Sequence, residues 1–277
     1  SGKSLQNYLD DAGEKDKVAV EKFIYKPSLS ALEFMELDLL KRLGRLNLFK
    51  PISKHIREYF KDPRLIKLLE FPSLLLGAKP SNTPALYSIM NYADLSLGTW
   101  YPNGGIRAIA TGLYQNALDH NVEFLFNHPV SKIETKENIV DHILVHDKKI
   151  NCDIVVGGAD YHHVENHLLN KKNRNYNDNY WDKRTMSPSS LLFYLGINKE
   201  LDIPHHALFF DTDFDKHAEE IYDKPQWPKN PLFYVSCTSK TDNSVAPKGS
   251  EAVFILVPVA PGLNDNENSR EIIFQQI

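Results

Sequence analysis

The 277-residue sequence contains few cysteines, no strong excess of charge of either sign and no long hydrophobic run. Its two cysteines, Cys152 and Cys237, form no C-x-x-C motif, which excludes a disulfide framework and fits a protein of the reducing cytoplasm. The net charge of -4 argues against a dedicated nucleic-acid binder, because such proteins usually carry a basic excess. Proline or glycine interrupts the longest uncharged stretches before they reach the roughly 20 apolar residues of a membrane-spanning helix. We therefore expect a globular protein that binds no nucleic acid.

Several self-contained catalytic motifs are also missing. There is no G-x-S-x-G, no H-E-x-x-H and no P-loop, and the 13 glycines form no G-x-G-x-x-G dinucleotide motif. The obvious metal candidates are two histidine pairs, at residues 162–163 and 205–206. Adjacent residues of a strand point to opposite faces, so such a pair is a poor chelate. We expect structural histidines and no metal site.

Neither end of the sequence has the pattern of a domain boundary. The chain starts with Ser1 and Gly2, without methionine, and it stops within the amphipathic pattern of residues 269–277. We therefore expect this chain to be a segment of a longer protein.

The first third of the chain has the pattern of several short helices. Ser30 and Glu33 form a capping box ahead of a run of leucines at helical spacing. An Asp-Pro pair at residues 62–63 and a Thr-Pro pair at residues 83–84 are typical helix starts. We expect a helical region over residues 1–83.

The pattern changes after the glycine pair at residues 104–105. An apolar stripe from Ile106 to Leu118 predicts a helix. Short apolar runs then predict four strands, at residues 122–126, 130–133, 139–145 and 154–156. The last run is apolar at every position, which is typical of a strand buried on both faces of a parallel sheet. We expect residues 84–165 to contain a parallel α/β layer.

Residues 166–277 have a third pattern. One helix is predicted near residues 217–221, and turns with Pro, Asn or Asp separate β-like runs at residues 191–197, 207–210, 232–236 and 252–259. Such an order is typical of a mixed layer with a largely antiparallel sheet. The expected fold class of the whole chain is therefore α/β plus α+β.

The pair Gly104–Gly105 is the most suggestive ligand-binding feature. Without side chains there, a ligand can approach the backbone at the start of the following helix, where N–H groups and the helix dipole favour negative charge. A plain turn is the alternative explanation, and the glycines alone do not exclude it.

Three runs of residues carry a resemblance to a known family. They are W-Y-P-N-G-G-I at residues 100–106, G-G-A-D-Y at 157–161 and S-P-S-S-L-L-F-Y-L-G at 187–196, and similar runs continue in order to residue 249. Here the chain resembles the FAD-dependent carotenoid desaturases of the bacterial phytoene-desaturase type. The resemblance implies that the chain is the middle of such an enzyme, between an N-terminal G-x-G-x-x-G and a C-terminal glycine-rich flavin motif.

The resemblance also implies which residues lie near FAD. Val130 matches the strand that contacts the adenine through its backbone, and the glycine pair matches a P-x-G-G turn close to cofactor and substrate. The residues at 158–160 match the turn in which the chain leaves the cofactor domain. The implied cofactor contacts are therefore Gly104, Gly105, Val130, Gly158, Ala159 and Asp160.

The substrate contacts implied by the resemblance are aromatic. Trp100 and Tyr101 are candidate walls of a substrate tunnel, with a purely structural role as the alternative. Some relatives have an Arg/Asp-bearing helix with a proposed acid–base role. The corresponding residues here, 30–36, contain glutamate but no arginine, so the catalytic residues stay unknown.

The activity implied is the desaturation of phytoene or a related carotenoid, in which oxidised FAD accepts a hydride. This chemistry needs aromatic and aliphatic walls that position a polyene and exclude water. The alternatives are an isoprenoid-binding or membrane-docking module, or a flavin-dependent isomerase or amine oxidase of the same fold. Because the pyrophosphate-binding turn is missing, we expect the segment alone to be inactive and to bind FAD weakly.

A basic stretch suggests how an apolar substrate is reached. Residues 41–67 contain nine basic and two acidic side chains, interleaved with apolar ones. We expect this face to dock on anionic lipid at the cytoplasmic membrane, as a peripheral protein does. A solvated helical face is the alternative. The residues expected to make the contact are Lys41, Arg42, Arg45 and Phe49.

Overall fold

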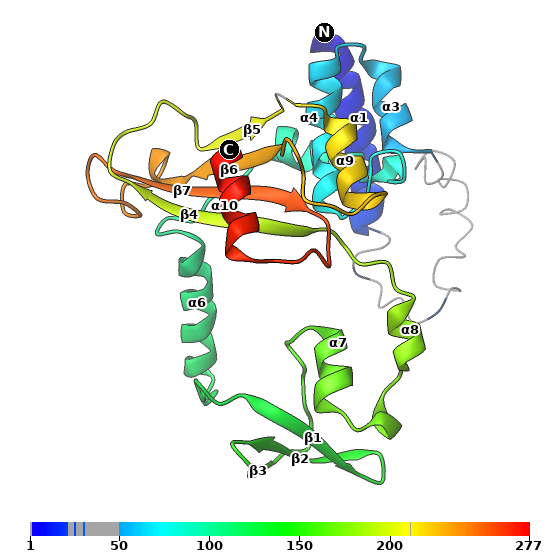
Figure 1. The fold of residues 1–277 in the computed structure, drawn as a ribbon, viewed down its shortest axis with the longest axis vertical. Helices are drawn as coiled ribbons and strands as arrows, with labels where there is room; N and C mark the ends of the chain where they lie inside the picture. The colour runs from blue at the N-terminus through cyan, green and yellow to red at the C-terminus, as the bar shows by residue number, and fades with distance from the viewer. Residues whose placement is uncertain (1, 22–24, 26–29, 31–49, 211) are drawn as a thin grey trace. The chain divides into compact units, whose positions relative to one another are not determined.

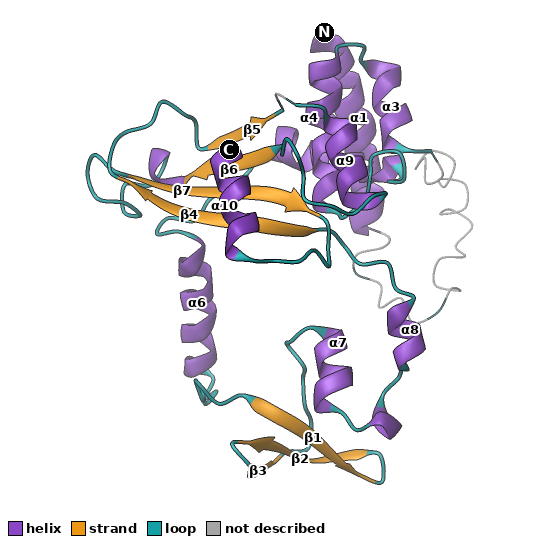
Figure 2. Cartoon of the chain, in the orientation of Figure 1, coloured by secondary structure: helices purple, strands orange, loops and turns teal. Residues whose placement is uncertain are grey.

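The computed structural model describes residues 2–21, 25, 30, 50–210 and 212–277. They form two compact units. The sheet unit comprises residues 1–110 and 187–277, and the inserted unit comprises residues 111–186. Each unit is described by itself, and Figures 1 and 2 show the elements of both.

The described residues in the first part of the sheet unit are mainly helical. Its helices are α1 (Gly2–Ala19), α3 (Ile52–Tyr59), α4 (Pro63–Leu75), the 3₁₀ helix η3 (Ala85–Ser88), α5 (Ile89–Tyr92) and η4 (Ala93–Leu97). α4 begins at the proline of the Asp-Pro pair, as predicted. The proline of the Thr-Pro pair instead precedes η3, in an extended conformation with ψ of 144°. The predicted capping box and the leucine run after it lie outside the described residues.

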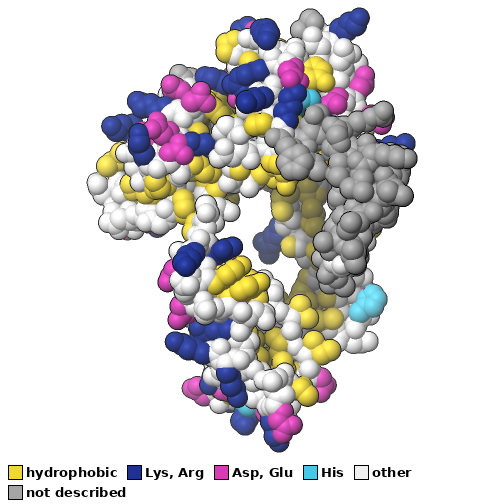
Figure 3. All heavy atoms as spheres, turned by 90° about the vertical axis from the view of Figure 1, so that its right-hand side faces the viewer, with side chains coloured by type: hydrophobic (Ala, Val, Ile, Leu, Met, Phe, Trp, Pro, Cys, Tyr) yellow, Lys and Arg dark blue, Asp and Glu magenta, His cyan; other side chains and the backbone are white. Residues whose placement is uncertain are grey.

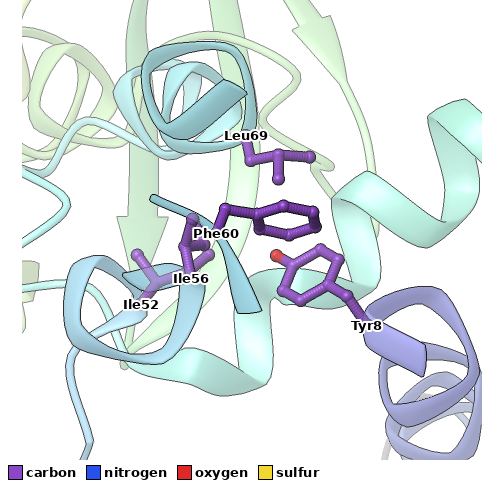
Figure 4. Close-up of a cluster of buried hydrophobic side chains, with 5 residues drawn as sticks. All are labelled: Tyr8, Ile52, Ile56, Phe60 and Leu69. Carbon is purple, nitrogen blue, oxygen red and sulfur yellow. The ribbon is translucent and has the colours of Figure 1, made fainter. Parts of the chain in front are cut away.

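The helices of the sheet unit pack around one apolar cluster. Figure 4 shows its buried side chains, which are Tyr8, Ile52, Ile56, Phe60 and Leu69. Asn91 donates hydrogen bonds from Nδ2 to the Tyr8 hydroxyl at 2.8 Å and to the Leu69 carbonyl at 3.0 Å. The cluster therefore joins α1, α3, α4 and α5.

A buried polar cluster lies beside this apolar one. Lys15 of α1 is 2% exposed, and its Nζ donates to Asp11 Oδ2 at 2.5 Å. The same Nζ lies 3.1 Å from His55 Nε2 of α3 and 3.4 Å from Ser88 Oγ of η3. Burial lowers the pKa of Lys15 and of His55, and in His55 the Lys15 charge adds to the effect. One lysine therefore ties three helices together.

The second part of the sheet unit is a four-stranded antiparallel sheet, as predicted. The strands are β4 (Ser189–Ile197), β5 (His206–Phe209), β6 (Phe233–Cys237) and β7 (Glu251–Val259), in the order β4-β7-β6-β5. Two helices accompany them, α9 (Phe214–Tyr222) near the predicted position and α10 (Glu267–Gln276).

The two faces of this sheet differ. Alternate side chains point to opposite faces of a strand, and the odd-numbered ones here form the core. This packed face includes Val235, Cys237, Val253 and Val257, and α10 covers part of it with Ile273. The even-numbered side chains form the other face, which we call the open face. They include the aromatic residues of the candidate site.

The inserted unit begins within a helix and continues as a small sheet. α6 (Ile106–Asp119) crosses its boundary, and β1 (Val130–Lys136), β2 (Ile139–Val145) and β3 (Lys148–Asn151) form two antiparallel hairpins. Both hairpins have two-residue turns with positive φ at both positions, 53° and 64° at residues 137–138 and 47° and 62° at residues 146–147. Such turns match the twist of the strands. Four short helical segments follow: α7 (Tyr161–His163), η5 (Val164–Leu168), η6 (Lys171–Asn173) and α8 (Asp178–Asp182).

The predicted parallel α/β layer is wrong for the described chain. Residues 122–126 and 154–156 are not strands, and the only parallel pair among the described strands and bridges is the isolated bridge between Ile133 and Leu169. A strand needs a neighbour for its backbone hydrogen bonds, and the described residues pair none with these two runs. Their side chains are accordingly exposed, to 80% at Ile154 and 89% at Val156. Figure 3 shows hydrophobic side chains on the surface of the inserted unit, in the lower part of the view.

Within the described residues, none of the helices combines the length and the apolar character needed to cross a bilayer.

Candidate functional site

A cavity of about 1000 Å³ lies on the open face of the four-stranded sheet, within the sheet unit. Its floor is a row of rings that crosses all four strands. Tyr194 and Phe254 have centroids 5.2 Å apart, Phe254 and Tyr234 6.4 Å, and Tyr234 and His206 5.8 Å. The floor therefore offers flat, mostly apolar surfaces to a ligand.

Strand register explains this row. Tyr194 pairs with Phe254, Phe254 with Ser236, and Ser236 with His206. Directly opposed residues point to the same face of a sheet, so these side chains share the open face. Tyr234 is two residues before Ser236 and lies on the same face.

The rim of the cavity comes from two loops that are distant in sequence. Trp100 and Tyr101 form one side, and residues 245–247 form the other. The backbone N–H of Gly104 donates to Asp242 Oδ2 at 2.7 Å, which fastens the first loop to the second. The Tyr101 ring stands edge-on to His205, with centroids 5.1 Å apart. The structure thus brings together four of the predicted residues, Trp100, Tyr101, Gly104 and Gly105.

The glycine pair is required by backbone geometry. Gly104 and Gly105 have φ of 83° and 84°, where L side chains are strained. A Cβ on Gly105 would lie 3.2 Å from the Tyr101 hydroxyl. Both N–H groups already have acceptors, Asp242 and the Pro102 carbonyl. The turn therefore does not offer these two N–H groups to an anion, contrary to the chemistry considered for it from sequence, although its Cα atoms allow close approach.

Two histidines mark one side of the floor. His206 Nδ1 lies 2.5 Å from the Tyr234 hydroxyl oxygen, and His205 Nδ1 lies 2.7 Å from Thr241 Oγ1. The two imidazole rings stack with centroids 4.3 Å apart. Burial, with a smaller contribution from His206, lowers the pKa of His205. No group of three or more metal-ligating side chains occurs in the part of the chain that the structure describes.

A buried carboxylate lies at the start of β7, on the packed face of the sheet beside Cys237. Glu251 is 5% exposed and accepts hydrogen bonds from Lys240, from Ser239 and, at 3.2 Å, from the backbone N–H of Leu201. These donors, Lys240 first, lower its pKa to about 2. Because its oxygens are already bound, Glu251 is suited to hold this end of β7 in place rather than to accept a proton.

The remaining predicted cofactor residues belong to the inserted unit. Val130 is the first residue of β1. Residues 158–160 form the turn before α7, where Asp160 accepts a hydrogen bond from the His163 N–H at 3.1 Å and so caps the helix. No atom lies within 4 Å of the place where a Cβ would stand on Gly158, so its backbone is open to a ligand. Ala159 is exposed beside it.

The residues predicted to contact the membrane, Lys41, Arg42, Arg45 and Phe49, lie outside the described residues. The sequence analysis missed most of the cavity floor, namely Tyr194, His206, Tyr234 and Phe254. The available signal was the alternation of the strands, which places these four residues on the face opposite the core positions.

Comparison with known proteins identifies the family. A family model described as flavin containing amine oxidoreductase matches residues 3–272. The chain belongs to this family. The chain spans about half the length of the curated relatives it matches.

The relatives of this flavin-containing oxidoreductase confirm the resemblance to carotenoid desaturases. The carotenoid 3,4-desaturase of Haloarcula japonica is 35% identical over 273 residues, which cover 98% of this chain and 55% of the relative. The zeta-carotene-forming phytoene desaturase of Myxococcus xanthus is 28% identical over 229 residues, or 82% of this chain and 44% of the relative. A solved oxidoreductase from Methanosarcina mazei shares the fold, with a TM-score of 0.56 at 19% identity over 82% of this chain and 50% of that one.

The residues present fit a flavin in part. Open space beside the Gly158 backbone, and the positive φ of the glycine pair, leave room for a flat ligand to approach the main chain. These residues belong to different units, and the sequence contains no G-x-G-x-x-G for a pyrophosphate. The open backbone at each of these turns fits the approach of a flat ligand, and the sequence has no motif of the usual kind for a pyrophosphate.

Proposed function

We propose that the protein carrying this chain is an FAD-dependent oxidoreductase that desaturates phytoene or a related carotenoid. The observation that carries the proposal is the cavity on the open face of the sheet, with its row of rings. A polyene is long, flat and apolar, and aromatic side chains offer it large contact areas at low entropic cost. The relatives named as carotenoid desaturases support the same substrate class.

The side chains of the cavity position the polyene and exclude water. Tyr194 and Phe254 form the flat floor, and Trp100, which is 88% exposed without a ligand, is placed to cover a bound polyene from the rim. A polyene held in the cavity meets the flavin in a fixed geometry rather than by random encounter. When bound, FAD supplies the oxidant that accepts a hydride from an allylic carbon.

FAD contacts are proposed for six residues of the chain. The glycine turn would pack close to the flavin ring and the substrate. Val130 and the 158–160 turn would contact the nucleotide part of FAD. The six are Gly104, Gly105, Val130, Gly158, Ala159 and Asp160. We also propose the three-part division into a helical region (1–83), an inserted part of the FAD domain (84–165) and a substrate-domain sheet (166–277).

Peripheral membrane association is part of the proposal. Lys54 and Lys61 are exposed on the helical part of the sheet unit, and Leu65 and Leu68 are 39% and 44% exposed. Figure 3 displays many Lys and Arg side chains in the upper part of the view. Cations beside exposed leucines are suited to an anionic lipid surface. Replacing Lys41, Arg42 and Arg45 by Glu should weaken sedimentation of the full-length protein with anionic liposomes, and equal sedimentation would contradict the proposal.

The experiment for the activity is expression of the full-length protein in cells that accumulate phytoene. Coloured products with additional conjugated double bonds are expected, and Gly105→Ala should reduce their amount because its side chain strains the turn. Unchanged phytoene, with the protein folded and loaded with flavin, would overturn phytoene as the substrate. The purified 277-residue chain, in contrast, should form no stoichiometric yellow complex with added FAD.

A further inference from the structure

Desaturation leaves one proton in the cavity for each double bond that it forms. One C–H bond of the polyene loses its hydrogen as a hydride. The neighbouring C–H bond loses its hydrogen as a proton, and the electrons that it leaves behind become the second bond of the alkene. Because the cavity excludes water around the polyene, a side chain has to accept this proton. A base is therefore expected among the residues that line the cavity.

Among the described residues, six titratable side chains line the cavity, and four of them are unsuited to accept a proton at neutral pH. The six are Tyr101, Tyr194, Tyr234, His205, His206 and Glu251. Glu251 lies on the packed face, and its donors Lys240 and Ser239 lower its pKa to about 2. A tyrosine hydroxyl already carries its proton up to about pH 10. Imidazole is the side chain that gains a proton between about pH 5 and 8, so the two histidines remain.

The two histidines differ in access to the cavity. Nε2 of His205 is buried without a partner among the described residues, and burial lowers the pKa of this histidine. His206 is exposed and lines the cavity. Its Nδ1 lies 2.5 Å from the Tyr234 hydroxyl oxygen, and its Nε2 has no hydrogen-bond partner in the described part of the chain. His206 is therefore the imidazole that a ligand in the cavity can reach.

Tyr234 can hold His206 in the form that accepts a proton. A tyrosine hydroxyl both donates and accepts, so it can take the hydrogen bond from Nδ1–H and leave the lone pair on Nε2. After a proton reaches Nε2, both ring nitrogens donate, and the bond from Nδ1 to the Tyr234 oxygen becomes charge-assisted and stronger. The contact between the two side chains thus suits the neutral and the protonated ring.

The histidines lie on the side of the cavity that contains the glycine turn. The Tyr101 hydroxyl is 3.2 Å from the place where a Cβ would stand on Gly105. The Tyr101 ring meets the His205 ring edge-on, with centroids 5.1 Å apart, and the His205 ring stacks on that of His206 at 4.3 Å. The glycine turn is proposed above to pack close to the flavin ring. Polyene carbons that react there therefore lie on the His206 side of the cavity.

We propose that His206 is the base of this desaturation, accepting on Nε2 the proton that the polyene releases, and that Tyr234 positions it. The inference rests on the proposed function and adds a catalytic residue to it. In each step one allylic C–H bond breaks, and its electron pair leaves with the hydrogen to reduce the flavin. The adjacent C–H bond breaks, its electron pair forms the new C=C bond, and its proton binds Nε2 to give an imidazolium. The imidazolium returns the proton to water when the product leaves.

The first test is His206→Gln, which keeps a polar side chain but removes the base. The full-length protein, purified with its flavin, is mixed anaerobically with excess phytoene, and the bleaching of the oxidised flavin gives the rate of the chemical step. We expect this rate to fall about 100- to 10,000-fold. Binding is measured separately with a fully conjugated carotenoid, which has no single bond left to desaturate, from the shift of its visible band. The Kd should stay within about 3-fold of the wild type.

The pH profile distinguishes a base from a structural residue. Phytoene has no titratable group, so the wild-type rate should fall as acid protonates His206, and this acid limb should disappear in His206→Gln. The titratable groups that face His206 are Tyr234 of β6, the adjacent His205, Tyr101 of the rim and, behind the sheet, Glu251 with Lys240. His205→Gln should keep the acid limb, which would assign it to His206 rather than to its neighbour.

Rescue by imidazole gives an independent readout. His206→Ala leaves space in the cavity wall, so added imidazole should raise its rate at least about 10-fold. Tyr234→Phe removes the positioning hydroxyl and should slow the step about 10-fold, without a response to imidazole. His120→Gln is the matched control, because His120 is exposed and lies outside the cavity lining. The same substitution there should leave the rate unchanged.

The outcomes separate this proposal from the proposed function. A wild-type rate in His206→Gln, or a slow rate with the acid limb intact and no rescue of His206→Ala, would overturn the base and leave the desaturation in place. A Kd weakened as much as the rate would assign His206 to binding and also overturn the base. If phytoene binds to the wild type and the flavin is not reduced, the proposed activity on phytoene is overturned, and the base with it.

Discussion

The two units of the chain differ in how far they bury their apolar side chains. The sheet unit has a helical cluster and a packed sheet face, with Tyr8, Ile56 and Val257 fully buried. Among the described residues of the inserted unit, only Ile133 and Val145 are both apolar and buried. The comparison teaches that the sheet unit is stabilised by its own core, whereas the inserted unit depends on turns and local hydrogen bonds.

The largest contrast is expected between Ile56→Ala and Ile154→Ala. Ile56 is fully buried among aromatic rings, so its truncation should cost about 2–5 kcal/mol of unfolding free energy. Ile154 is 80% exposed, so the same change there should stay within about 0.5 kcal/mol. Urea denaturation of the 277-residue chain measures both. A large loss for Ile154→Ala would contradict the comparison, and repeating it in the full-length protein would reveal whether another segment buries this side chain.

The buried lysine offers the next largest effect. Asp11→Asn removes the carboxylate that pairs with Lys15, and we expect the free energy of unfolding to fall by about 2–3 kcal/mol. The loss is smaller than for a fully buried pair because the Asp11 side chain is 31% exposed. Adding Lys15→Met should recover most of this loss, since no unpaired charge is then buried. Thermal unfolding of the single and double variants checks the pair. If the double variant is as unstable as the single one, the charge is not the cause.

Acid should weaken the sheet unit through two buried histidines. The Leu232 N–H donates to His217 Nδ1 at 3.1 Å, and His217 Nε2 then donates to the Pro258 carbonyl at 3.0 Å. Burial lowers the pKa of His217 and of His55 below the ordinary 6.5. Their unfolded forms bind protons first, so stability is fully present above about pH 6.5 and is lost as pH falls toward the folded pKa values.

The slope of this loss is at most about 1.4 kcal/mol per pH unit for each histidine. Urea midpoints measured between pH 7.5 and 5.5 test it. Replacing both histidines by Gln should flatten the dependence, and an unchanged slope would assign the acid sensitivity to other groups.

The smallest expected effect concerns helix caps. The Asp213 side chain accepts hydrogen bonds from the N–H groups of Asp215 and Lys216 at the start of α9, and Asp213→Ala should cost about 1 kcal/mol. Asn177 caps the five-residue helix α8 of the inserted unit, accepting from the Tyr180 N–H at 2.9 Å. Its replacement by Ala should cost closer to 0.5 kcal/mol. Equal losses of unfolding free energy for the two variants, measured by chemical denaturation, would contradict the expected difference between the two units.

The sequence predicted the strands of the sheet unit better than those of the inserted unit. The apolar runs at β4, β5, β6 and β7 were predicted as strands, and they are strands in the structure because each has its partner within the chain. Residues 122–126 and 154–156 have the composition of strands, but composition carries no information about whether a neighbour is present. Within the expected helical region, the sequence carried no signal for α1 in particular, because its buried face contains Ala12 and Lys15 rather than a stripe of large apolar side chains.

The candidate site was only half predictable. The glycine pair and Trp100 stand out by residue type, so the rim was found from sequence. The floor was not found, because Tyr194 and Phe254 become neighbours only through the pairing of β4 with β7. A hydrogen bond such as that of Gly104 to Asp242, 138 residues away, likewise depends on tertiary structure alone.

The edge position of β4 has a consequence for how this chain behaves in concentrated solution. β4 is nine residues long, has no charged side chain and pairs on one side only, with β7, in the described sheet. A long uncharged edge is a template for a strand from another molecule. Copies of the 277-residue chain should therefore associate edge to edge as their concentration rises, and a single lysine at Leu192, which is 39% exposed, should raise their solubility. The strand that supplies Tyr194 to the cavity thus also limits how far the separate chain can be concentrated.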